Sequence, residues 1–410
     1  MSPGGILAVG LFIAGVLLEA PALAAVGVLL GLVAVLRTLW SRYGLRALAY
    51  ERHLSSRRVP WGGRIELDLV VRNAKPLPLP RLQIDDLVSR EADIVGVPLD
   101  PSPDSGFAVL AQTWSVGWFE RVTRRLEIVG SRRGRYRFVS ARLQVADLFG
   151  ESSVAEDRPL ATTYRVVPRT VAVRSTRADT PTAGAARAPH GLIEEPSLFA
   201  GVRPYQPGDP LRRIHWKATA RVGRPVSRRF DPAREREVLL AVDMQTVAGA
   251  SWQLTWDEDL VEGLCVAALS LARSFITDGV AVGLAVNAYS DRPQRTVFLP
   301  PSATPTQLAA IADYLADVSP FASMPFERLL AGVARRAPMG CAVVALSGRD
   351  PSDVLPVLRR LGAQGYRTSH AALGPDAARW SARARSFGVP SAAYRLHPDW
   401  RTADALERVA

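Results

Sequence analysis

The first feature of the chain is an uninterrupted apolar stretch near its amino end. From Ile6 to Leu36 the sequence runs for 31 residues with one charged side chain, Glu19, which lies just before Pro21. One straight helix of that length would extend about 46 Å, well beyond a hydrocarbon core of about 30 Å. The pattern therefore predicts a transmembrane helical hairpin over residues 1–40, with its turn between Glu19 and Pro21.

Basic residues follow the second arm of this hairpin at once, at Arg37, Arg42 and Arg46. Arginines that flank a membrane span mark its cytoplasmic side. We therefore expect the hairpin to contact the lipid bilayer of the inner (cytoplasmic) membrane and the soluble domains to face the cytoplasm. A signal peptide is the alternative, but the start of the chain carries no Lys or Arg, and the apolar run outlasts an h-region.

Alternation of apolar and polar positions begins after the hairpin. Between Arg64 and Asn73 every second residue is apolar, which is the period of a strand buried on one face. Further strand-like runs, separated by turn signals, cover residues 107–118, 122–129, 136–145 and 163–167. Short strands between turns are typical of a sandwich or barrel. We expect a juxtamembrane segment over 41–60 and an all-β sandwich-like domain over 61–175.

The pattern changes again in the second half of the chain. Residues 176–236 are first small and polar and then basic, so we expect a linker and a basic signature segment without strands. Beyond Glu237, apolar strands alternate with helical patterns over residues 257–277, 306–318, 326–335, 352–364 and 376–387. This alternation indicates a doubly wound α/β sheet with a parallel centre. The α/β domain is expected over 237–400, with residues 392–396 as an edge strand.

Charge is concentrated in the basic segment. The chain has 51 Lys and Arg against 39 Asp and Glu, a net charge of +12. Residues 201–236 hold ten basic and three acidic side chains, and so carry +7 of that excess. Such a segment suits an anionic partner. Its aromatic residues are only Tyr205, Trp216 and Phe230, too few for a base-stacking platform, so we expect no nucleic-acid partner.

Cysteine and lysine usage excludes several classes of protein. Cys265 and Cys341 lie in separate apolar stretches, which rules out a disulfide scaffold and a cysteine-based zinc site. Neither Lys75 nor Lys217 follows a glycine, so a Walker-type phosphate loop is absent. No two of the five histidines have metal-ligand spacing, and no Gly-x-Ser-x-Gly elbow supports a hydrolase triad.

The basic segment also contains a helix signal. A tight turn, an N-cap and a helix-starting proline follow one another in the residues Pro207, Gly208, Asp209 and Pro210. A short helix is expected from there to Gly223. Its apolar face would consist of Leu211, Ile214, His215 and Ala218. Arg212 and Trp216 are four residues apart on another face, a spacing that allows a cation–π contact.

The run from Arg203 to Arg221 resembles the signature of the bacterial domain-of-unknown-function family fifty-eight. Further segments that agree with it are Arg133-Gly134-Arg135-Tyr136, Asp147-Leu148-Phe149-Gly150 and Val166-Val167-Pro168-Arg169. The resemblance implies a membrane-anchored protein with a von Willebrand factor A-like α/β domain. It also implies association with a cytoplasmic MoxR-type AAA+ ATPase, and with other membrane or envelope proteins, in complex assembly or cell-envelope maintenance.

Two interpretations of the signature stay open. In the structural one, Asp209 caps its helix, the arginines pair with carboxylates or carbonyls, and Trp216 packs the β domain against the α/β domain. In the functional one, the arginines form a docking surface for an acidic partner. The candidate partner-binding residues are Arg203, Tyr205, Gly208, Asp209, Arg212, Ile214, Trp216, Ala220 and Arg221.

A von Willebrand A-like domain holds a divalent cation through Asp-x-Ser-x-Ser after its first strand, so the resemblance also implies a place for a metal. Here Asp243 matches, Gln245 offers an amide oxygen and Val247 offers no ligand. With two later-loop candidates, the degenerate set is Asp243, Gln245, Ser347 and Asp350. We expect no cofactor; the alternative is Mg²⁺ bound by this set.

The expected function is that of a non-catalytic, membrane-anchored protein-interaction module. One alternative is an enzyme acting on envelope precursors, which predicts a closed pocket with polar side chains around Asp243. Another is a metal-dependent ligand-binding protein, in which a chelator would abolish ligand binding and leave the fold intact.

Overall fold

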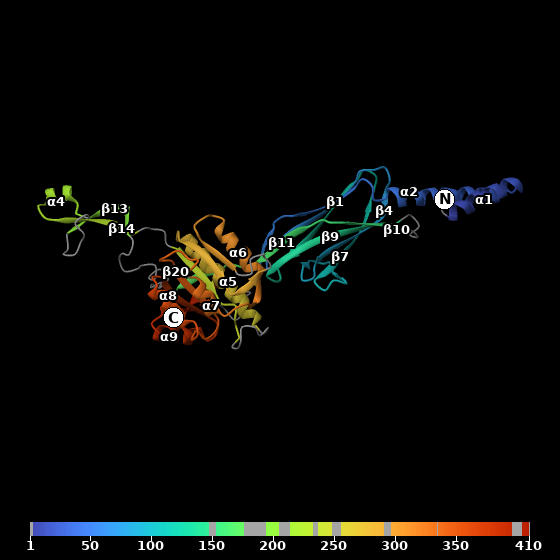
Figure 1. Ribbon diagram of the computed structural model, residues 1–410. Helices are drawn as coiled ribbons and strands as arrows, with labels where there is room; N and C mark the ends of the chain where they lie inside the picture. The colour runs from blue at the N-terminus through green and yellow to red at the C-terminus, as the bar shows by residue number, and fades with distance from the viewer. Residues whose placement is uncertain are drawn as a thin grey trace. The chain divides into compact units, whose positions relative to one another are not determined.

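The computed structural model describes residues 3–146, 153–175, 194–204, 214–232, 237–247, 256–290, 297–333, 335–395 and 404–409. The chain divides into two compact units, residues 1–167 and 168–410. The first unit holds a helical hairpin and a β domain; the second holds an α/β sheet and a two-stranded ribbon (Figure 1). Each unit is described by itself below.

The expected hairpin is formed by two helices, α1 (Pro3–Leu17) and α2 (Pro21–Tyr43). The chain reverses at Glu19, whose φ of 50° lies in the left-handed region. The helices approach closely at glycine: a Cβ on Gly15 would clash with the backbone nitrogen of Ala24. Two arms in close contact, joined by a short turn, therefore replace the single long helix that the apolar run alone could suggest.

Among the described residues, two helices are long and apolar enough to cross a membrane by length and composition. One is α2, of whose apolar stretch only 6% is buried. The other is α5 (Glu258–Thr277), of whose apolar stretch 61% is buried, and which contacts the strands of the α/β sheet. The hairpin is therefore the candidate membrane segment, while α5 is a core helix of the second unit.

The end of α2 is built into the β domain. The Trp40 side chain is 6% exposed and packs in the β-domain core, and its indole Nε1 donates to the carbonyl of Pro78 at 3.1 Å. Strand β1 (Leu48–Leu54) follows directly and pairs with β3 (Arg64–Asn73). The separate juxtamembrane segment expected over 41–60 is therefore wrong, because its residues complete α2 and supply strands of the β domain.

The β domain is built from two sheets. One has the order β1-β3-β8-β5, where β8 is Arg121–Val129 and β5 is Asp93–Ile94. The other has the order β2-β11-β9-β4-β7-β6, with β10 paired to β9. Its strands are β2 (Arg58–Pro60), β4 (Leu79–Ser89), β6 (Asp100–Pro101), β7 (Phe107–Val116), β9 (Gly134–Ala146), β10 (Ser153–Arg158) and β11 (Thr162–Val167). Apolar side chains of both sheets share one core, as a sandwich requires.

A buried polar group interrupts this core. Asp86 of β4 is fully buried and accepts a hydrogen bond from the Tyr50 hydroxyl. The Arg52 guanidinium lies 3.2 Å from the Asp86 carboxylate and also donates to the carbonyl of Leu160. It stacks over the ring of Phe138, 5.0 Å from the centroid. Burial raises the pKa of Asp86 to about 6, against the opposing effect of Arg52.

The second unit contains an eight-stranded sheet of order β12-β23-β22-β21-β20-β15-β16-β18. Its strands are β12 (Ala172–Ser175), β15 (Glu237–Val242), β16 (Ala281–Val286), β18 (Val297–Ser302), β20 (Ala342–Ser347), β21 (Arg367–Leu373), β22 (Ser391–Arg395) and β23 (Ala405–Arg408). The five strands from β16 to β22 run parallel, while β18 is antiparallel to β16. The central strands are buried on both faces, which explains their continuous apolar sequences.

The helices that alternate with these strands lie close to the predicted ranges. Besides α5, they are α6 (Gln307–Asp317), α7 (Phe326–Val333), α8 (Leu355–Ala363) and α9 (Ala377–Ser386). A small antiparallel pair, β17 (Ala288–Ser290) with β19 (Val318–Ala322), adds to them. The alternation of apolar strands and helical patterns thus predicted the elements of this α/β unit.

Two predictions about this sheet are wrong. The β22 strand is not an edge, because β23 pairs with it antiparallel and β12 pairs with β23. The α/β unit also does not begin at residue 237, because β12 belongs to its sheet rather than to the β domain. Both errors arise because β12 and β23 are short strands of four residues, which carry too little periodicity to be recognised alone.

The expected linker contains a ribbon. Strand β13 (Glu194–Pro204) pairs antiparallel with β14 (Val226–Pro232), and helix α4 (Trp216–Val222) lies in the segment between them. The prediction that 176–236 holds no strand is therefore wrong. Its bulged register explains why no clean alternation marks it in the sequence.

Candidate functional site

The carboxyl edge of the α/β sheet is the first candidate site. The strand order turns outward from β15, with β16 on one side and β20 on the other. At such a switch point the loops after the two strands diverge and leave the usual binding crevice of an open α/β sheet. Asp243 follows β15 directly, Asn287 follows β16 and Arg349 follows β20. Residues that are far apart in sequence thus meet at one edge.

Asp243 is fully buried at this edge and bonded through both carboxylate oxygens. Its Oδ1 accepts from the backbone N–H of Gln245 at 3.0 Å and from Asn287 Nδ2 at 2.7 Å. Its Oδ2 accepts from Arg349 Nε at 2.8 Å. Burial raises the pKa of Asp243 above its ordinary value, while Arg349 and these hydrogen bonds act in the opposite direction.

Arg349 joins two carboxylates. Besides Asp243, its Nη1 lies 2.8 Å from Asp353 Oδ2, and its side chain is only 13% exposed. Asn287 extends the network, because its Oδ1 accepts from the backbone N–H of Met244 at 2.7 Å. The arrangement holds the ends of three strands together and leaves the Asp243 oxygens occupied by donors of the protein itself.

His370 of β21 lies beside this network in the same sheet. Its Nε2 is 2.9 Å from Ser347 Oγ and its Nδ1 is 3.1 Å from Ser391 Oγ. The ring is 1% exposed, and burial lowers the pKa of His370 to about 4. The imidazole is therefore neutral at pH 7 and bridges two hydroxyls inside the sheet.

The predicted metal ligands have separate partners. Asp243 pairs with Arg349, Ser347 bonds to His370, and Asp350 bonds to Ser352 and Arg383. Within the described residues, no three His, Cys, Asp or Glu side chains gather as a metal would require. The cation at Asp243 is a guanidinium, so the donor set does not fit the all-oxygen shell that Mg²⁺ prefers.

Sequence reasoning missed Asn287, Arg349 and His370. The first two stand immediately beyond strands that the sequence did predict. A rule that collects every polar residue just after an apolar strand would have found them. His370 lies within its strand, and its spacing from other residues carries no signal.

The basic signature is the second candidate site. The structure describes Arg203, paired with Ser227 across the ribbon, and residues from Ile214 onward. Tyr205, Gly208, Asp209 and Arg212 lie outside the described residues, and with them the proposed cap and cation–π contact. The described part is sufficient to define helix α4.

Helix α4 begins later than predicted. Ile214 forms a β-bridge with Ser227, and His215 is the N-cap, with Nδ1 accepting from the backbone N–H of Ala218 at 3.1 Å. Neither belongs to the helix, so the predicted apolar face is wrong. The bridge to β14 buries the Ile214 side chain, while the predicted turn over 207–210 lies outside the described residues. The predicted end is confirmed, because Gly223 caps the helix with a φ of 71°.

The outer side of α4 is exposed. The Trp216 side chain is 68% exposed, and Lys217, Ala220 and Arg221 are also exposed. Within its own unit, Trp216 is therefore not part of the core. An exposed tryptophan beside basic side chains instead forms a surface of the kind found at the centre of protein interfaces.

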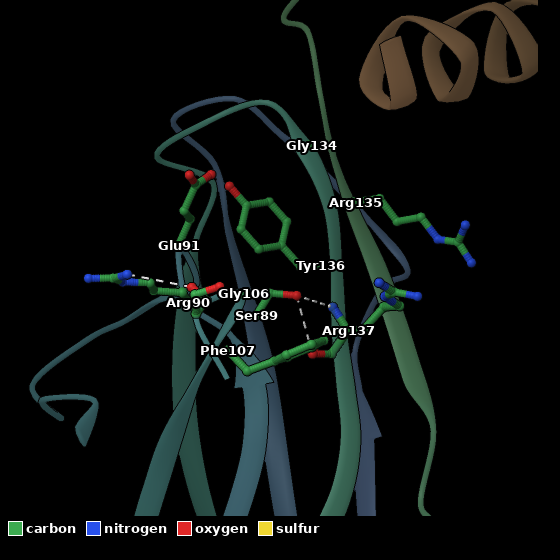
Figure 2. A pocket seen from close by; sticks show the side chains of 10 residues that line it. Ser89, Arg90, Glu91, Gly106, Phe107, Gly134, Arg135, Tyr136 and Arg137 are labelled. Carbon is green, nitrogen blue, oxygen red and sulfur yellow. Dashed lines mark hydrogen bonds between the residues drawn. The ribbon is translucent and has the colours of Figure 1, made fainter. Parts of the chain in front are cut away.

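A groove of about 710 Å³ lies in the β domain, and Gly134, Arg135 and Tyr136 of the Arg133–Tyr136 motif line it (Figure 2). Tyr136 is buried, donates from its hydroxyl to the carbonyl of Arg132 at 2.7 Å and stacks on Tyr164 at 5.1 Å between centroids. In Figure 2 the Arg135 and Arg137 side chains point away from Tyr136. The described contacts of this motif are thus those of core packing and strand pairing.

Together, these observations define a protein with an apolar helical hairpin, a β sandwich and an α/β unit that carries a basic ribbon. Residues 201–364 match the family described as "Protein of unknown function DUF58". A relative in Bacillus subtilis (strain 168), described as "Uncharacterized protein YeaD", is 24% identical over 248 residues, which cover 59% of this chain. The match covers 56% of that relative, so the chain spans about half of its length.

Solved structures give only weak likenesses. The CARDB domain of the PF1109 protein from Pyrococcus furiosus, in complex with di-metal ions, is 16% identical and covers 30% of this chain and 87% of its own, with a TM-score of 0.20. AvmM, which catalyses macrocyclization in alchivemycin A biosynthesis, is 14% identical and covers 29% of this chain and 88% of its own, with a TM-score of 0.22. Scores of this size do not establish a shared fold.

Proposed function

We propose that this chain is a non-catalytic, membrane-anchored interaction module that works with a cytoplasmic MoxR-type AAA+ ATPase in complex assembly or cell-envelope maintenance. The observation that carries the proposal is the exposed face of α4, where Trp216 stands beside Lys217 and Arg221. Tryptophan and arginine are the residues that most often dominate binding energy at interfaces. An acidic surface on the ATPase is the partner chemistry that suits them.

The carboxyl edge of the sheet supports a non-catalytic role. The Asp243 carboxylate is fully buried and accepts from Gln245, Asn287 and Arg349, whereas a general base must lie within hydrogen-bond reach of its substrate. In this proposal the edge belongs to a von Willebrand A-like domain, and its hydrogen bonds hold the ends of three strands together without a bound cofactor. Partner recognition belongs to the ribbon and α4.

The cytoplasmic orientation is part of the proposal. Arg42 and Arg46 are exposed immediately after the apolar part of α2, where positive residues favour the inner side. Protease added to spheroplasts should leave the β domain and the α/β unit intact, and the same protease added to inverted vesicles should degrade them. Digestion in spheroplasts would overturn the orientation and, with it, the cytoplasmic partner.

The partner is tested by crosslinking the full chain in native membranes and identifying captured proteins by mass spectrometry. Trp216→Ala and Arg221→Ala should each lower capture of a MoxR-type ATPase by about thirtyfold, which is the effect of losing an interface hot spot. Met339→Ala is the matched control, because Met339 is also exposed, at 78%, but lies outside the ribbon and α4. Undiminished capture by the α4 variants would contradict docking through α4.

An enzyme acting on envelope precursors is the second candidate, favoured by the position of Asp243 at the switch point. It predicts that purified protein turns over a precursor and that Asp243→Asn, which keeps the size of the side chain, abolishes turnover. If wild-type protein shows no turnover with the envelope precursors tested while ATPase capture is intact, the interaction module stands.

A further inference from the structure

A pair of exposed aromatic side chains lies at the end of the β domain that α2 enters. Trp118 and Phe119 form the tip of the turn between β7 and β8, and their side chains are 70% and 69% exposed. Both rings stand out from the domain instead of packing in its core. Exposed large aromatics that are neighbours on one turn indicate a surface that binds something apolar.

The turn is held rigidly in this exposed position. Asn73, which is 1% exposed, donates from Nδ2 to the carbonyl of Gly117 at 2.7 Å and to that of Leu77 at 2.9 Å. The backbone N–H of Phe119 donates to the carbonyl of Lys75 at 3.2 Å. Phe119 itself has a φ of 53°, in the left-handed region that non-glycine residues rarely adopt. The tip is therefore tied to the loop between β3 and β4.

The same loop fixes the depth of the tip relative to α2. Pro78 of that loop accepts the hydrogen bond of Trp40, which lies in the last turn of α2. Counting from Pro21, a helix reaches a span of about 30 Å after about 20 residues, which is the position of Trp40. If the hairpin crosses a bilayer, the loop and the tip attached to it lie at the boundary between hydrocarbon and headgroups.

The charge near the tip fits this boundary. Arg72 and Arg121 are direct partners across β3 and β8, and both are exposed. Like charges in such a pair destabilise a sheet unless an anionic group faces them. Arg42 and Arg46 are exposed at the same end of the domain. Arginines around exposed aromatic rings match an anionic lipid surface, where tryptophan is also enriched.

We infer that the turn holding Trp118 and Phe119 inserts into the headgroup region of the bilayer, with Arg72 and Arg121 facing anionic phospholipid headgroups. The β domain is then attached to the membrane at two places, α2 and this tip, and its orientation is set. This inference rests on the proposed membrane anchor in one respect only, the crossing of the bilayer by the hairpin. It requires no ATPase partner.

The test measures depth with a fluorescent label in the full chain reconstituted in vesicles of phosphatidylcholine and phosphatidylglycerol. In a background with Cys265→Ala and Cys341→Ala, a bimane label is placed at Phe119→Cys, and nitroxide-labelled lipids act as quenchers. Phe119→Cys should be quenched by lipids with a shallow nitroxide. Trp118→Cys serves as a second position if the first variant does not fold.

Two control positions separate the outcomes. Val95, 42% exposed, follows β5 near Ile128 and Val129, at the opposite end of the domain, and Val95→Cys should not be quenched. Leu29 lies on α2 and is 60% exposed, and a bimane label at Leu29→Cys should be quenched by a lipid with a deep nitroxide. Quenching at Leu29 but equal signals at Phe119 and Val95 overturns the inference and leaves the anchor intact. No quenching at Leu29 overturns the anchor and the inference together.

The role of the arginines has its own comparison. Replacing Arg72 and Arg121 by Gln should lower the ratio of inserted to free tip by about fivefold per arginine in vesicles with phosphatidylglycerol. In vesicles of phosphatidylcholine alone, the ratio of inserted to free tip should be the same for this variant and for the protein with both arginines. Equal quenching of both proteins in both vesicles would contradict recognition of anionic headgroups.

Discussion

Among the described residues, each unit contains a fully buried aspartate that pairs with an arginine, Asp86 in the first and Asp243 in the second, and the two pairs differ in what surrounds them. Asp86 lies within β4, in the middle of an apolar core, and Arg52 is almost as deeply buried as the carboxylate. Asp243 lies beyond the end of β15, and Arg349 reaches from it to the half-exposed Asp353. Besides Asp86, Arg52 contacts the neutral carbonyl of Leu160 and the Phe138 ring, whereas Arg349 has a second carboxylate in Asp353.

This difference determines how much stability each pair loses when one of its members is removed. A buried charge that loses its partner costs more than the pair itself contributes. We therefore expect the loss of one member to cost more stability in the β-domain pair than in the pair at the sheet edge, where Arg349 keeps Asp353 as a partner. Measurements on the two units should show this contrast directly, and hydrogen exchange across a urea series can follow peptides of each unit separately.

The largest effect is expected for Asp86→Ala. It leaves the Arg52 charge buried and the Tyr50 hydroxyl without its acceptor, which should lower the free energy of unfolding of the β domain by about 3–5 kcal/mol. Asp85→Asn is the control, since Asp85 is half-buried on the neighbouring position of β4. A loss below about 1 kcal/mol would show that Arg52 finds another acceptor.

Opposite pH slopes are expected next. His370 has its pKa lowered from 6.5 to about 4, so its contribution to stability is present above pH 6.5 and lost as the pH falls towards 4. Asp86 has its pKa raised from 3.8 to about 6, so its contribution is present below 3.8 and lost as the pH rises through 6. Each contribution is about 3 kcal/mol.

Urea denaturation at pH values from 4 to 7 measures this contrast. As the pH rises, the free energy of unfolding should increase for the α/β unit through His370 and decrease for the β domain through Asp86. His370→Asn and Asp86→Asn should each flatten the slope of their own unit and leave the other unchanged. If the α/β unit keeps its slope after His370→Asn, other groups carry the pH dependence.

A smaller loss is expected for Asp243→Ala. Arg349 keeps Asp353 as a partner and its side chain reaches solvent, so the α/β unit should lose about 2 kcal/mol, less than the β domain loses with Asp86→Ala. Asp243→Asn, which can still accept from Gln245, should cost less than the alanine variant. A loss equal to that of Asp86→Ala would mean that the sheet edge is as closed as the core.

The smallest effect is expected for Asp350→Ala. Asp350 pairs with Arg383 at the surface, where the side chains are 47% and 45% exposed, and such pairs contribute less than about 1 kcal/mol. Thermal unfolding should be nearly unchanged. A loss as large as that of Asp243→Ala would indicate that Asp350 belongs to the buried network after all.

Much of the fold could be predicted from the sequence because burial leaves a local period. The break at Glu19, the alternation from Ile65 to Val71 and the apolar strands of the α/β unit all reflect which side of an element is covered. Pairing between distant strands leaves no such trace. For this reason the sequence did not predict β12 or β23, and β22 was wrongly expected to be an edge strand.

The candidate site could be predicted only in part. Asp243 was found because it ends a strand that was itself predicted, but its partner Arg349 is 106 residues away and no spacing rule joins them. The signature stands out in the sequence by its charge, while the described helix α4 begins at Trp216, since Ile214 pairs with Ser227. In both places a tertiary contact decided the outcome over a local signal.

The pairing of β12 with β23 has a consequence for biogenesis. Residues 172–175 leave the ribosome long before residues 405–408, which complete their side of the sheet. The hairpin can insert into the bilayer and the β domain can fold before residues 405–408 are available to pair with β12, since domains fold in order during synthesis at about 5–20 residues per second. During that interval β12 is an unpaired strand of the nascent α/β unit. An unpaired strand edge favours aggregation, so this is the stage at which we expect chaperone binding to matter most.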